Sequence, residues 1–323
     1  MTGIKSNKIA DLYHWFKNNL WGLPSDRERT AVADEVFLRL LDLPKDQRVI
    51  KATERISETG IVKLIKAQKR LNQGEPVQYI TGISTFLDHA IRVKPGILIP
   101  RPETEGLVLW VEEVIRKEKE RHAEHPGSGK KTPTQTAGSE EKAGDILDIG
   151  TGSGCIAIAL AAKLPEYQVS ACDIDQNILE VAQNNAQQNN VLINFFLADI
   201  LQDTQPPSAC DVDVIVSNPP YVRQLEKAGL QKQVRAFEPA GALFVPDEDP
   251  LLFYRAICAF ARTALRPGGW LFFEINEVMG EACVALMKLH GFQDVELSHD
   301  FHGKDRYVAG RSIQPKDGKD HLG

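Results

Sequence analysis

The stretch DILDIGTGSG, residues 145–154, decides the fold of this 323-residue chain. An apolar run, 146–149, leads directly into three glycines at alternate positions, and the helix-forming run 155–163 follows. Glycines at such a turn let the backbone bend sharply into a helix and approach a ligand closely. Their spacing is G-x-G-x-G rather than G-x-G-x-x-G, which argues against a dinucleotide-binding turn. The stretch therefore predicts a strand, a ligand-binding turn and a helix in succession.

Strands and helices alternate through the rest of the C-terminal part. Strands are expected at 146–149, 169–172, 193–197, 212–216, 270–275, 295–297 and 307–309. Helices are expected at 103–119, 155–163, 174–188, 251–265 and 278–290. This alternation is typical of a doubly wound, mostly parallel sheet. The last two strands have no helix between them, so we expect them to pair antiparallel. The prediction is an α/β fold whose seven-stranded sheet contains one antiparallel strand.

Acidic side chains stand at the ends of two of these strands. Asp173 ends the second strand, where a carboxylate can accept hydrogen bonds from both ribose hydroxyls of a nucleoside. Asp175 is the alternative, but we expect it to cap the next helix. Asp199 follows the third strand, where an acceptor can meet an adenine amino group. Because parallel strands end at the same sheet edge, these positions predict a crevice for a nucleoside.

The fourth strand leads into Asn218-Pro219-Pro220-Tyr221. Proline has no N–H group, so this turn presents carbonyl groups and cannot continue a ladder. The side-chain carbonyl of Asn218 adds another acceptor, and two neighbouring acceptors can hold an NH₂ group by its two hydrogens. Tyr221 supplies a flat face for a planar group. The turn therefore predicts a site for a planar amide or amine at the same sheet edge.

The chain is expected to have two domains and a linker. Residues 1–75 carry helical patterns, with Ser25 and Glu28 at capping-box spacing, and predict a small helical domain. Residues 76–100 are rich in strand formers broken by glycine and proline, which predicts a linking β-hairpin. Residues 101–313 form the domain with the alternating pattern.

Two polar segments belong to neither core. Residues from about 120 to 144 are rich in Gly, Ser, Thr, Pro, Lys and Glu, and their few apolar side chains are alanines. Such a composition cannot bury a core, so we expect a mobile insert. Residues 314–323 are expected to be a polar tail.

Composition and charge describe a globular chain. Hydrophobic residues make up 42% and charged residues 25%, with a net charge of −6. Residues 1–75 carry 14 Lys and Arg against 10 Asp and Glu, a net of +4, so the remainder carries −10. A protein that binds nucleic acid by charge alone is expected to be basic, which argues against that function.

Metal, disulfide, export and membrane signals are weak. The five cysteines are odd in number and none is in C-x-x-C spacing, so neither a zinc site nor a disulfide framework follows. His299 and His302 lie between expected strands without a Cys or Glu cluster, so no metal is expected there. Residues 1–20 are polar and contain no apolar core of a signal peptide. No apolar stretch is long enough to cross a membrane, and we expect a cytoplasmic protein.

The combined motifs resemble a known enzyme family. D-I-G-T-G-S-G, the acidic residue after strand two and N-P-P-Y after strand four resemble a class I, Rossmann-like S-adenosylmethionine-dependent methyltransferase. Upstream, GEPVQYITG at 74–82 and LIPRPETE at 98–105 resemble the PrmC/HemK family, which methylates peptide chain release factors. The resemblance covers roughly residues 10–311.

This resemblance implies an activity and a cofactor. It implies methyl transfer from S-adenosyl-L-methionine to the N5 amide nitrogen of the glutamine in the Gly-Gly-Gln motif of class I release factors, modulating translation termination. The expected product of the cofactor is S-adenosyl-L-homocysteine. The release factor is the expected partner, recognised by the helical domain. We expect no metal, no direct contact with nucleic acid or membrane, and a monomer.

The resemblance also implies roles for individual residues. The implied catalytic residues are Asn218, Pro219 and Tyr221. The implied substrate-binding residues are Asn218, Pro219, Pro220, Tyr221 and Arg101. The implied cofactor-binding residues are Gly150, Thr151, Gly152, Ser153, Gly154, Asp173, Asp199, Ile200 and Asn218.

The chain departs from the family pattern at a few places. The insert before the first strand is longer than usual. Asn276 and Met279 replace the glycine and glutamine typical of the loop after residues 270–275, which puts a role of that loop in doubt. Ile200 stands where an aromatic residue is common, so its contact with adenine would be only apolar.

Two alternative functions stay open at this point. A nucleic-acid amino-methyltransferase would share N-P-P-Y, but it needs a basic groove for a flipped base, whereas the part after residue 75 is acidic. A non-catalytic module with a retained cofactor fold predicts loss of Asn218 or the glycine turn, and both are intact.

Overall fold

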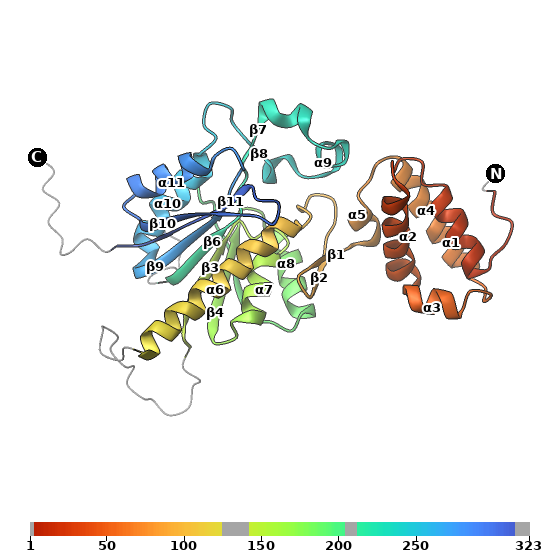
Figure 1. The fold of residues 1–323 in the computed structure, drawn as a ribbon, viewed down its shortest axis with the longest axis horizontal. Coiled ribbons are helices and arrows are strands. Elements are labelled where there is room, and N and C mark those ends of the chain that lie inside the picture. Colours follow the sequence, from red (N-terminus) through yellow and green to blue (C-terminus); the bar gives the residue numbers. More distant parts are fainter. Residues whose placement is uncertain (1–2, 125–141, 204–211, 314–323) are drawn as a thin grey trace, which may run out of the picture. The chain divides into compact units, whose positions relative to one another are not determined.

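The computed structural model describes residues 3–124, 142–203 and 212–313 (Figure 1). The chain divides into two compact units. The first unit consists of residues 1–84, 92–99 and 229–239, and the second of residues 85–91, 100–228 and 240–323. Among the described residues, no helix combines the length and apolar character that a membrane crossing would require.

The first unit contains a small helical core. Its helices are α1 (Ile9–Asn18), α2 (Asp26–Leu41), α3 (Lys45–Ile50), α4 (Glu58–Asn72) and α5 (Val77–Thr81). Leu12, Phe16 and Phe37 are fully buried between them. The side chain of Ser25 accepts a hydrogen bond from the N–H of Glu28 at 3.1 Å, which confirms the expected N-cap of α2.

The segment expected as the first part of a hairpin is a helix. α5 occupies positions whose side chains favour strands, because Pro76 starts the helical turn and Gly82, with φ of +77°, ends it. The apolar side of α5 packs into the helical core. The hairpin itself is confirmed but shorter than expected, with β1 (Ile83–Phe86) and β2 (His89–Arg92).

The second unit is built on the expected seven-stranded sheet. Its strands are β3 (Gly144–Ile149), β4 (Tyr167–Asp173), β5 (Ile193–Leu197), β6 (Val212–Ser217), β9 (Leu265–Glu274), β10 (Gln293–His299) and β11 (Asp305–Arg311). The strand order is β10-β11-β9-β6-β3-β4-β5. β11 runs antiparallel to both of its neighbours, whereas the other pairs of strands in this sheet are parallel. The predicted topology is therefore confirmed.

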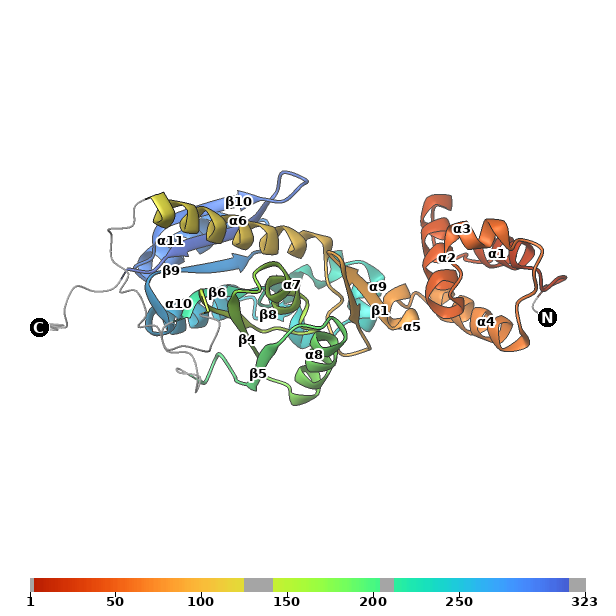
Figure 2. The same cartoon turned by 90° about the horizontal axis from the view of Figure 1, so that it is seen from below.

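Helices cover both faces of this sheet (Figures 1 and 2). One face carries α6 (Pro102–Glu124), α7 (Cys155–Lys163) and α8 (Gln176–Gln188), with α7 in contact with both others. The opposite face carries α10 (Leu252–Ala264) and α11 (Gly280–Leu289). Apolar strand residues are buried beneath both helix layers, which explains why the strands read as continuous apolar runs.

The boundaries of the expected insert were wrong. α6 continues to Glu124, five residues beyond the expected end, and β3 begins at Gly144. The ion pair between Arg121 and Glu118, three residues apart on the helix, reaches past the expected end and supports this extension. Residues 125–141 and the tail from 314 lie outside the described residues, so the mobility of the insert stays a prediction.

The segment between β6 and α10 contains short elements that no sequence pattern predicted. They are β7 (Val222–Arg223), η1 (Gln224–Gly229), α9 (Lys232–Phe237), η2 (Ala240–Ala242) and β8 (Phe244–Val245). β7 and β8 pair in parallel, so the chain beyond N-P-P-Y is anchored by a sheet of its own.

The chain changes direction across the sheet at β3. From β3 it runs outward through β4 and β5, then returns to place β6 on the other side of β3. Ile149 pairs with both Cys172 of β4 and Ser217 of β6. The three strands therefore end level with one another at the switch point, where open α/β sheets bind ligands.

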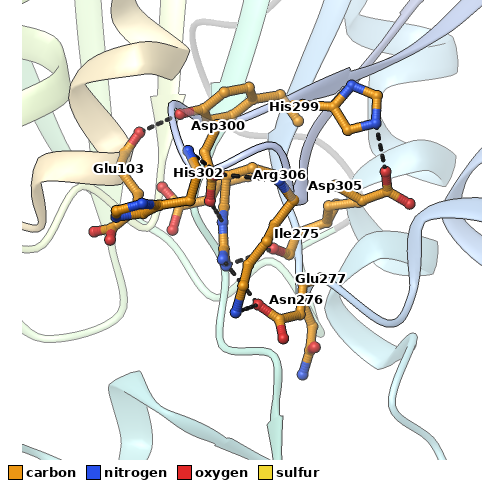
Figure 3. Close-up of polar contacts among 12 residues, drawn as sticks. Glu103, Ile275, Asn276, Glu277, His299, Asp300, His302, Asp305 and Arg306 are labelled. Carbon is orange, nitrogen blue, oxygen red and sulfur yellow. Dashed lines mark hydrogen bonds and ion pairs between the residues drawn. The ribbon is translucent and has the colours of Figure 1, made fainter.

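A close contact fixes the start of α6 on the sheet. The hydroxyl of Tyr307 in β11 donates a hydrogen bond to the carbonyl of Glu103 at 2.5 Å (Figure 3). Gly106 makes room for this ring, since a Cβ there would overlap the hydroxyl and lie 2.8 Å from Cζ of Tyr307.

We expect Gly106→Ala to lower the free energy of unfolding by about 1–3 kcal/mol, because the ring must move. The cost should be smaller in a Tyr307→Phe background, which lacks the overlapping hydroxyl. Urea unfolding of the four proteins measures both effects. A gain of about 1 kcal/mol, as at an open helix position, would contradict the contact.

Candidate active site

The glycine turn after β3 leaves open space on one side. Gly150, Gly152 and Gly154 have φ of +72°, +55° and +83°, in the region that favours glycine. A Cβ on Gly150 or Gly152 would meet no atom within 4 Å, whereas one on Gly154 would lie 3.1 Å from the Cβ of Ala182. The first two glycines therefore face room for a ligand, and the third allows α7 and α8 to pack closely.

A buried carboxylate stands beneath this turn. Asp148 is fully buried, and its Oδ2 accepts a hydrogen bond from the hydroxyl of Thr151 at 2.6 Å. Its Oδ1 has no hydrogen-bond partner among the described residues. Burial raises the pKa of Asp148 to about 7, although the bond from Thr151 opposes the shift. The carboxylate therefore braces the glycine turn through Thr151.

Ser153 plays a packing role in this turn. Its side chain is buried, and its carbonyl accepts a hydrogen bond from Nδ2 of the fully buried Asn185 at 2.9 Å. This bond ties the turn to α8.

Asp173 braces the glycine turn from the end of β4. Its Oδ2 accepts the N–H of Gly152 at 3.0 Å and its Oδ1 accepts the N–H of Asp175 at 3.3 Å. The side chain is buried, and burial raises the pKa of Asp173. Asp175 accepts the N–H of Asn177 at 2.8 Å, which confirms it as the cap of α8.

Asp199 and Ile200 follow β5, which ends at the same edge of the sheet as β4. Asp199 forms a tight turn, in which its Oδ1 accepts the N–H of Leu201 at 3.0 Å. Ile200 packs against the hydrophobic core formed by the sheet with helices α10 and α11. The N–H of Ala198 donates to the carbonyl of Asp173 at 3.1 Å, so the turn begins directly beside the end of β4.

The N-P-P-Y turn begins where β6 is locked to β3. The hydroxyl of Ser217 donates to the carbonyl of Ile149 at 2.7 Å. Asn218 then donates from Nδ2 to the hydroxyl oxygen of Thr104 at 3.1 Å. Pro219 is buried. The side-chain NH₂ of Asn218 is thus engaged within the protein, and its carbonyl oxygen is the group left to meet a ligand.

Tyr221 is fixed by a buried carboxylate. Its hydroxyl donates to Oε1 of Glu274 at 3.1 Å, and its side chain packs against the hydrophobic core formed by the sheet with helices α10 and α11. The hydroxyl of Thr104 donates to Oε2 of the same carboxylate at 2.6 Å. Burial raises the pKa of Glu274, while the bond from Thr104 and the charge of Arg306 oppose the shift. Burial likewise raises the pKa of Tyr221.

Arg101 lies at the entrance to α6. Its carbonyl accepts the N–H of Thr104 at 3.1 Å. Its positive charge lies close enough to Tyr221 to oppose the rise of that pKa. The charge of Arg101 therefore acts on Tyr221, and the resemblance implies a substrate-binding role for both residues.

The loop after β9 is held by Asn276, which stands at a position of departure from the family pattern, and by Arg306. Nδ2 of Asn276 donates to the carbonyl of Tyr221 at 3.4 Å and to Glu226 at 3.3 Å. Arg306 donates to Asp300 at 3.1 Å and to the carbonyl of Ile275 at 3.4 Å (Figure 3). This loop is thus anchored to the N-P-P-Y turn through Asn276.

The histidines near this loop make no metal cluster. His299 pairs with Asp305 at 3.1 Å between Nε2 and Oδ1 (Figure 3). No group of three metal-ligating side chains occurs in the part of the chain that the structure describes.

Known proteins match this chain along most of its length. Residues 135–251 match the model of the methyltransferase small domain. A release factor glutamine methyltransferase of Bacteroides thetaiotaomicron is 42% identical over 74% of this chain and 77% of its own length. One from Lactococcus lactis is 34% identical over 89% of this chain and 96% of its own length. The chain belongs to the release factor glutamine methyltransferase family. The resemblance seen in the sequence motifs is thereby confirmed.

Three buried residues of this family member were not singled out from sequence. Asp148 lies within an apolar strand and reads as an interruption of it, although it directly precedes the glycine turn. Thr104 lies inside the LIPRPETE motif, and Glu274 ends β9. The quoted motifs were the available signal for Asp148 and Thr104, but only the fold brings Thr104 and Glu274 together.

We expect Asp173→Ala to weaken S-adenosylmethionine binding by about 1.5–3 kcal/mol, the range for hydrogen bonds to a charged group. Asp175→Ala is the matched control, because it removes a helix cap beside the site and should chiefly lower stability. Calorimetric titration of both variants measures the two affinities. Unchanged affinity in Asp173→Ala with a loss in Asp175→Ala would reverse the assignment.

We expect a pH dependence of stability from Asp148. Its pKa lies near 7 in the folded chain against 3.8 ordinarily, so the folded state binds more protons between these values. The free energy of unfolding should therefore fall as pH rises from about 4 to 7. Between pH 5 and 8 this fall should be about 1–3 kcal/mol smaller in Asp148→Asn. Urea unfolding at several pH values tests it, and identical slopes would contradict the assignment.

Proposed function

We propose that this chain transfers a methyl group from S-adenosyl-L-methionine to the N5 amide nitrogen of the glutamine in the Gly-Gly-Gln motif of class I release factors. The observation that carries the proposal is the orientation of Asn218. Its NH₂ group is engaged by Thr104, so it offers an oxygen to a substrate NH₂. The names of the relatives from Bacteroides thetaiotaomicron and Lactococcus lactis support the same substrate.

The cofactor site is proposed at the switch point of the sheet. The open space beside Gly150 and Gly152 fits a cofactor that approaches the backbone of the turn closely. Asp173, Asp199 and Ile200 would hold its nucleoside. When bound, S-adenosylmethionine supplies an electrophilic methyl group on a positively charged sulfur.

The chain's own residues would act on the substrate amide. An amide nitrogen is a poor nucleophile because its lone pair is delocalised into the carbonyl. The side-chain oxygen of Asn218 and the carbonyl of Pro219 would each accept one of its two hydrogens, which increases electron density on nitrogen as the new bond forms. Tyr221 would pack against the amide plane. Orientation of this kind can contribute roughly 7–11 kcal/mol in favourable cases.

The substrate is proposed to be a protein rather than a nucleobase. N-P-P-Y alone does not distinguish an amide from an adenine, because both present a planar NH₂ group. The part of the chain after residue 75 carries a net charge of −10, which is unfavourable for a polyanion. The helical domain 1–75, with +4, offers a second surface for a folded partner with an acidic patch. We propose that it recognises the release factor.

We expect Asn218→Ala to lower the rate of methyl transfer by about 10²–10³-fold, by analogy with loss of an oxyanion-hole donor. Cofactor affinity should change far less, because the variant keeps the glycine turn and Asp173. Radiolabelled methyl transfer and calorimetry measure the two quantities separately.

The substrate class is tested by offering labelled cofactor with either a release factor or duplex DNA. Label in the release factor, lost when the glutamine of Gly-Gly-Gln is replaced, is the expected result. Label in DNA, with none in the release factor, would contradict the proposed function.

A further inference from the structure

A chain of three hydrogen bonds, one buried and two part-buried, ends at Asn218. Glu274 of β9 accepts the hydroxyl hydrogen of Thr104 from α6 at 2.6 Å. Thr104 accepts a hydrogen from Nδ2 of Asn218 at 3.1 Å. The second oxygen of Glu274 accepts the hydroxyl hydrogen of Tyr221 at 3.1 Å. Thr104 and Glu274 are 3% and 1% exposed, so water cannot replace these partners.

While Glu274 is charged, the hydrogen bonds from Asn218 through Thr104 to Glu274 can run in only one direction. A carboxylate only accepts hydrogen bonds, and a hydroxyl has a single hydrogen. Thr104 gives that hydrogen to Glu274, so toward Asn218 it can only accept. The NH₂ group of Asn218 must then face Thr104, and its oxygen must face away.

Burial raises the pKa of Glu274, and three groups around the carboxylate oppose this shift. Each of its two oxygens receives a hydroxyl donor, and hydrogen bonds to a carboxylate stabilise its charge. The cation of Arg306 is near enough to act in the same direction. Arg306 is itself held by Asp300 and the carbonyl of Ile275 (Figure 3). The position of the cation is therefore fixed by Asp300, between β10 and β11, and by Ile275, directly after β9.

We propose that Glu274 is a positioning residue that, through Thr104, fixes the Asn218 side chain with its oxygen toward the substrate amide. The same carboxylate holds the ring of Tyr221 by its hydroxyl. Glu274 thus sets the direction of one substrate acceptor and the place of the neighbouring aromatic wall. The inference rests on the proposed function for the identity of the substrate, but the hydrogen-bond direction can be tested without it.

A reversed amide would fail in a specific way. With its NH₂ group toward the substrate, Asn218 would present hydrogens to the hydrogens of an amide NH₂. Its oxygen would then face Thr104, whose only hydrogen is already given to Glu274. Disorder between the two orientations would lower the fraction of productive complexes without altering the cofactor site.

The kinetic test uses full-length variants of Thr104 and Glu274, which we call the relay because they connect through hydrogen bonds to Asn218. Thr104→Val keeps the shape but removes the hydroxyl, and Glu274→Gln replaces a pure acceptor by a group that can also donate. Each should lower kcat by about 10–100-fold, since small misplacement of a reacting group has costs of this order. The KM for release factor should change less than kcat, and cofactor affinity should stay within about twofold. Thr104→Ser, which keeps the hydroxyl, should restore kcat to within about threefold.

Tyr254→Phe is the matched stability control. Its hydroxyl donates to the backbone carbonyl of Glu274 at 3.1 Å and is equally buried, but it does not touch the carboxylate. Its loss should lower stability to a similar extent while leaving kcat within about threefold. A loss of kcat in Tyr254→Phe as large as in Thr104→Val would assign the effect to general destabilisation and overturn the proposal.

A mutant cycle tests whether the relay acts through Asn218. In an Asn218→Ala background, Thr104→Val should change kcat by less than about twofold, because the group that it orients is gone. If kcat of the double variant falls by the product of the two single losses, Thr104 acts independently of Asn218, and the inference is overturned.

Nuclear magnetic resonance tests the hydrogen-bond direction without any substrate. The side-chain NH₂ signals of Asn218 are identified in ¹⁵N-labelled protein by their absence in Asn218→Ala. Their hydrogen exchange should be at least about tenfold faster in Thr104→Val, and unchanged in Thr104→Ser and Tyr254→Phe. An amide that exchanges freely in the unmodified chain would overturn the relay. Lack of release factor methylation with a protected amide would instead contradict the proposed function alone.

Discussion

The shared end of β4, β3 and β6 is the constraint on which the site depends. Ile149 pairs with Cys172 on one side and with Ser217 on the other, so the chain leaves all three strands at one level. The glycine turn, Asp173 and Asn218 follow directly. A register shift of one residue in any of these strands would turn its ligand-facing side chains to the opposite face of the sheet.

A buried carboxylate links this edge to the rest of the second unit. Glu274 joins α6 through Thr104 and the N-P-P-Y turn through Tyr221. An unpaired buried charge would be strongly destabilising, and two hydroxyl donors and the cation of Arg306 oppose the effect of burial on this one. Asn276 adds a further tie to the carbonyl of Tyr221. The N-P-P-Y turn is therefore held from the sheet edge and from the loop after β9.

The sequence allowed prediction of the sheet because its strands are buried on both faces and read as apolar runs between helical patterns. The short helix α5 was missed because Pro76 and Gly82 override the strand preference of the residues between them. The two-residue strands β7 and β8 are too short to carry a pattern. That Asp173 and Asn218 follow strands which end level was predictable from the pattern, whereas the contact between Thr104 and Glu274 joins residues 170 positions apart.

The central claim is that this edge presents acceptors to the NH₂ group of a protein glutamine. Tandem mass spectrometry of a release factor incubated with the enzyme and S-adenosylmethionine tests it most directly. The account predicts one added methyl group, located by fragmentation on the side-chain amide of the glutamine in Gly-Gly-Gln. A methyl group on another residue, or an unmodified release factor beside an enzyme that binds the cofactor, would contradict it.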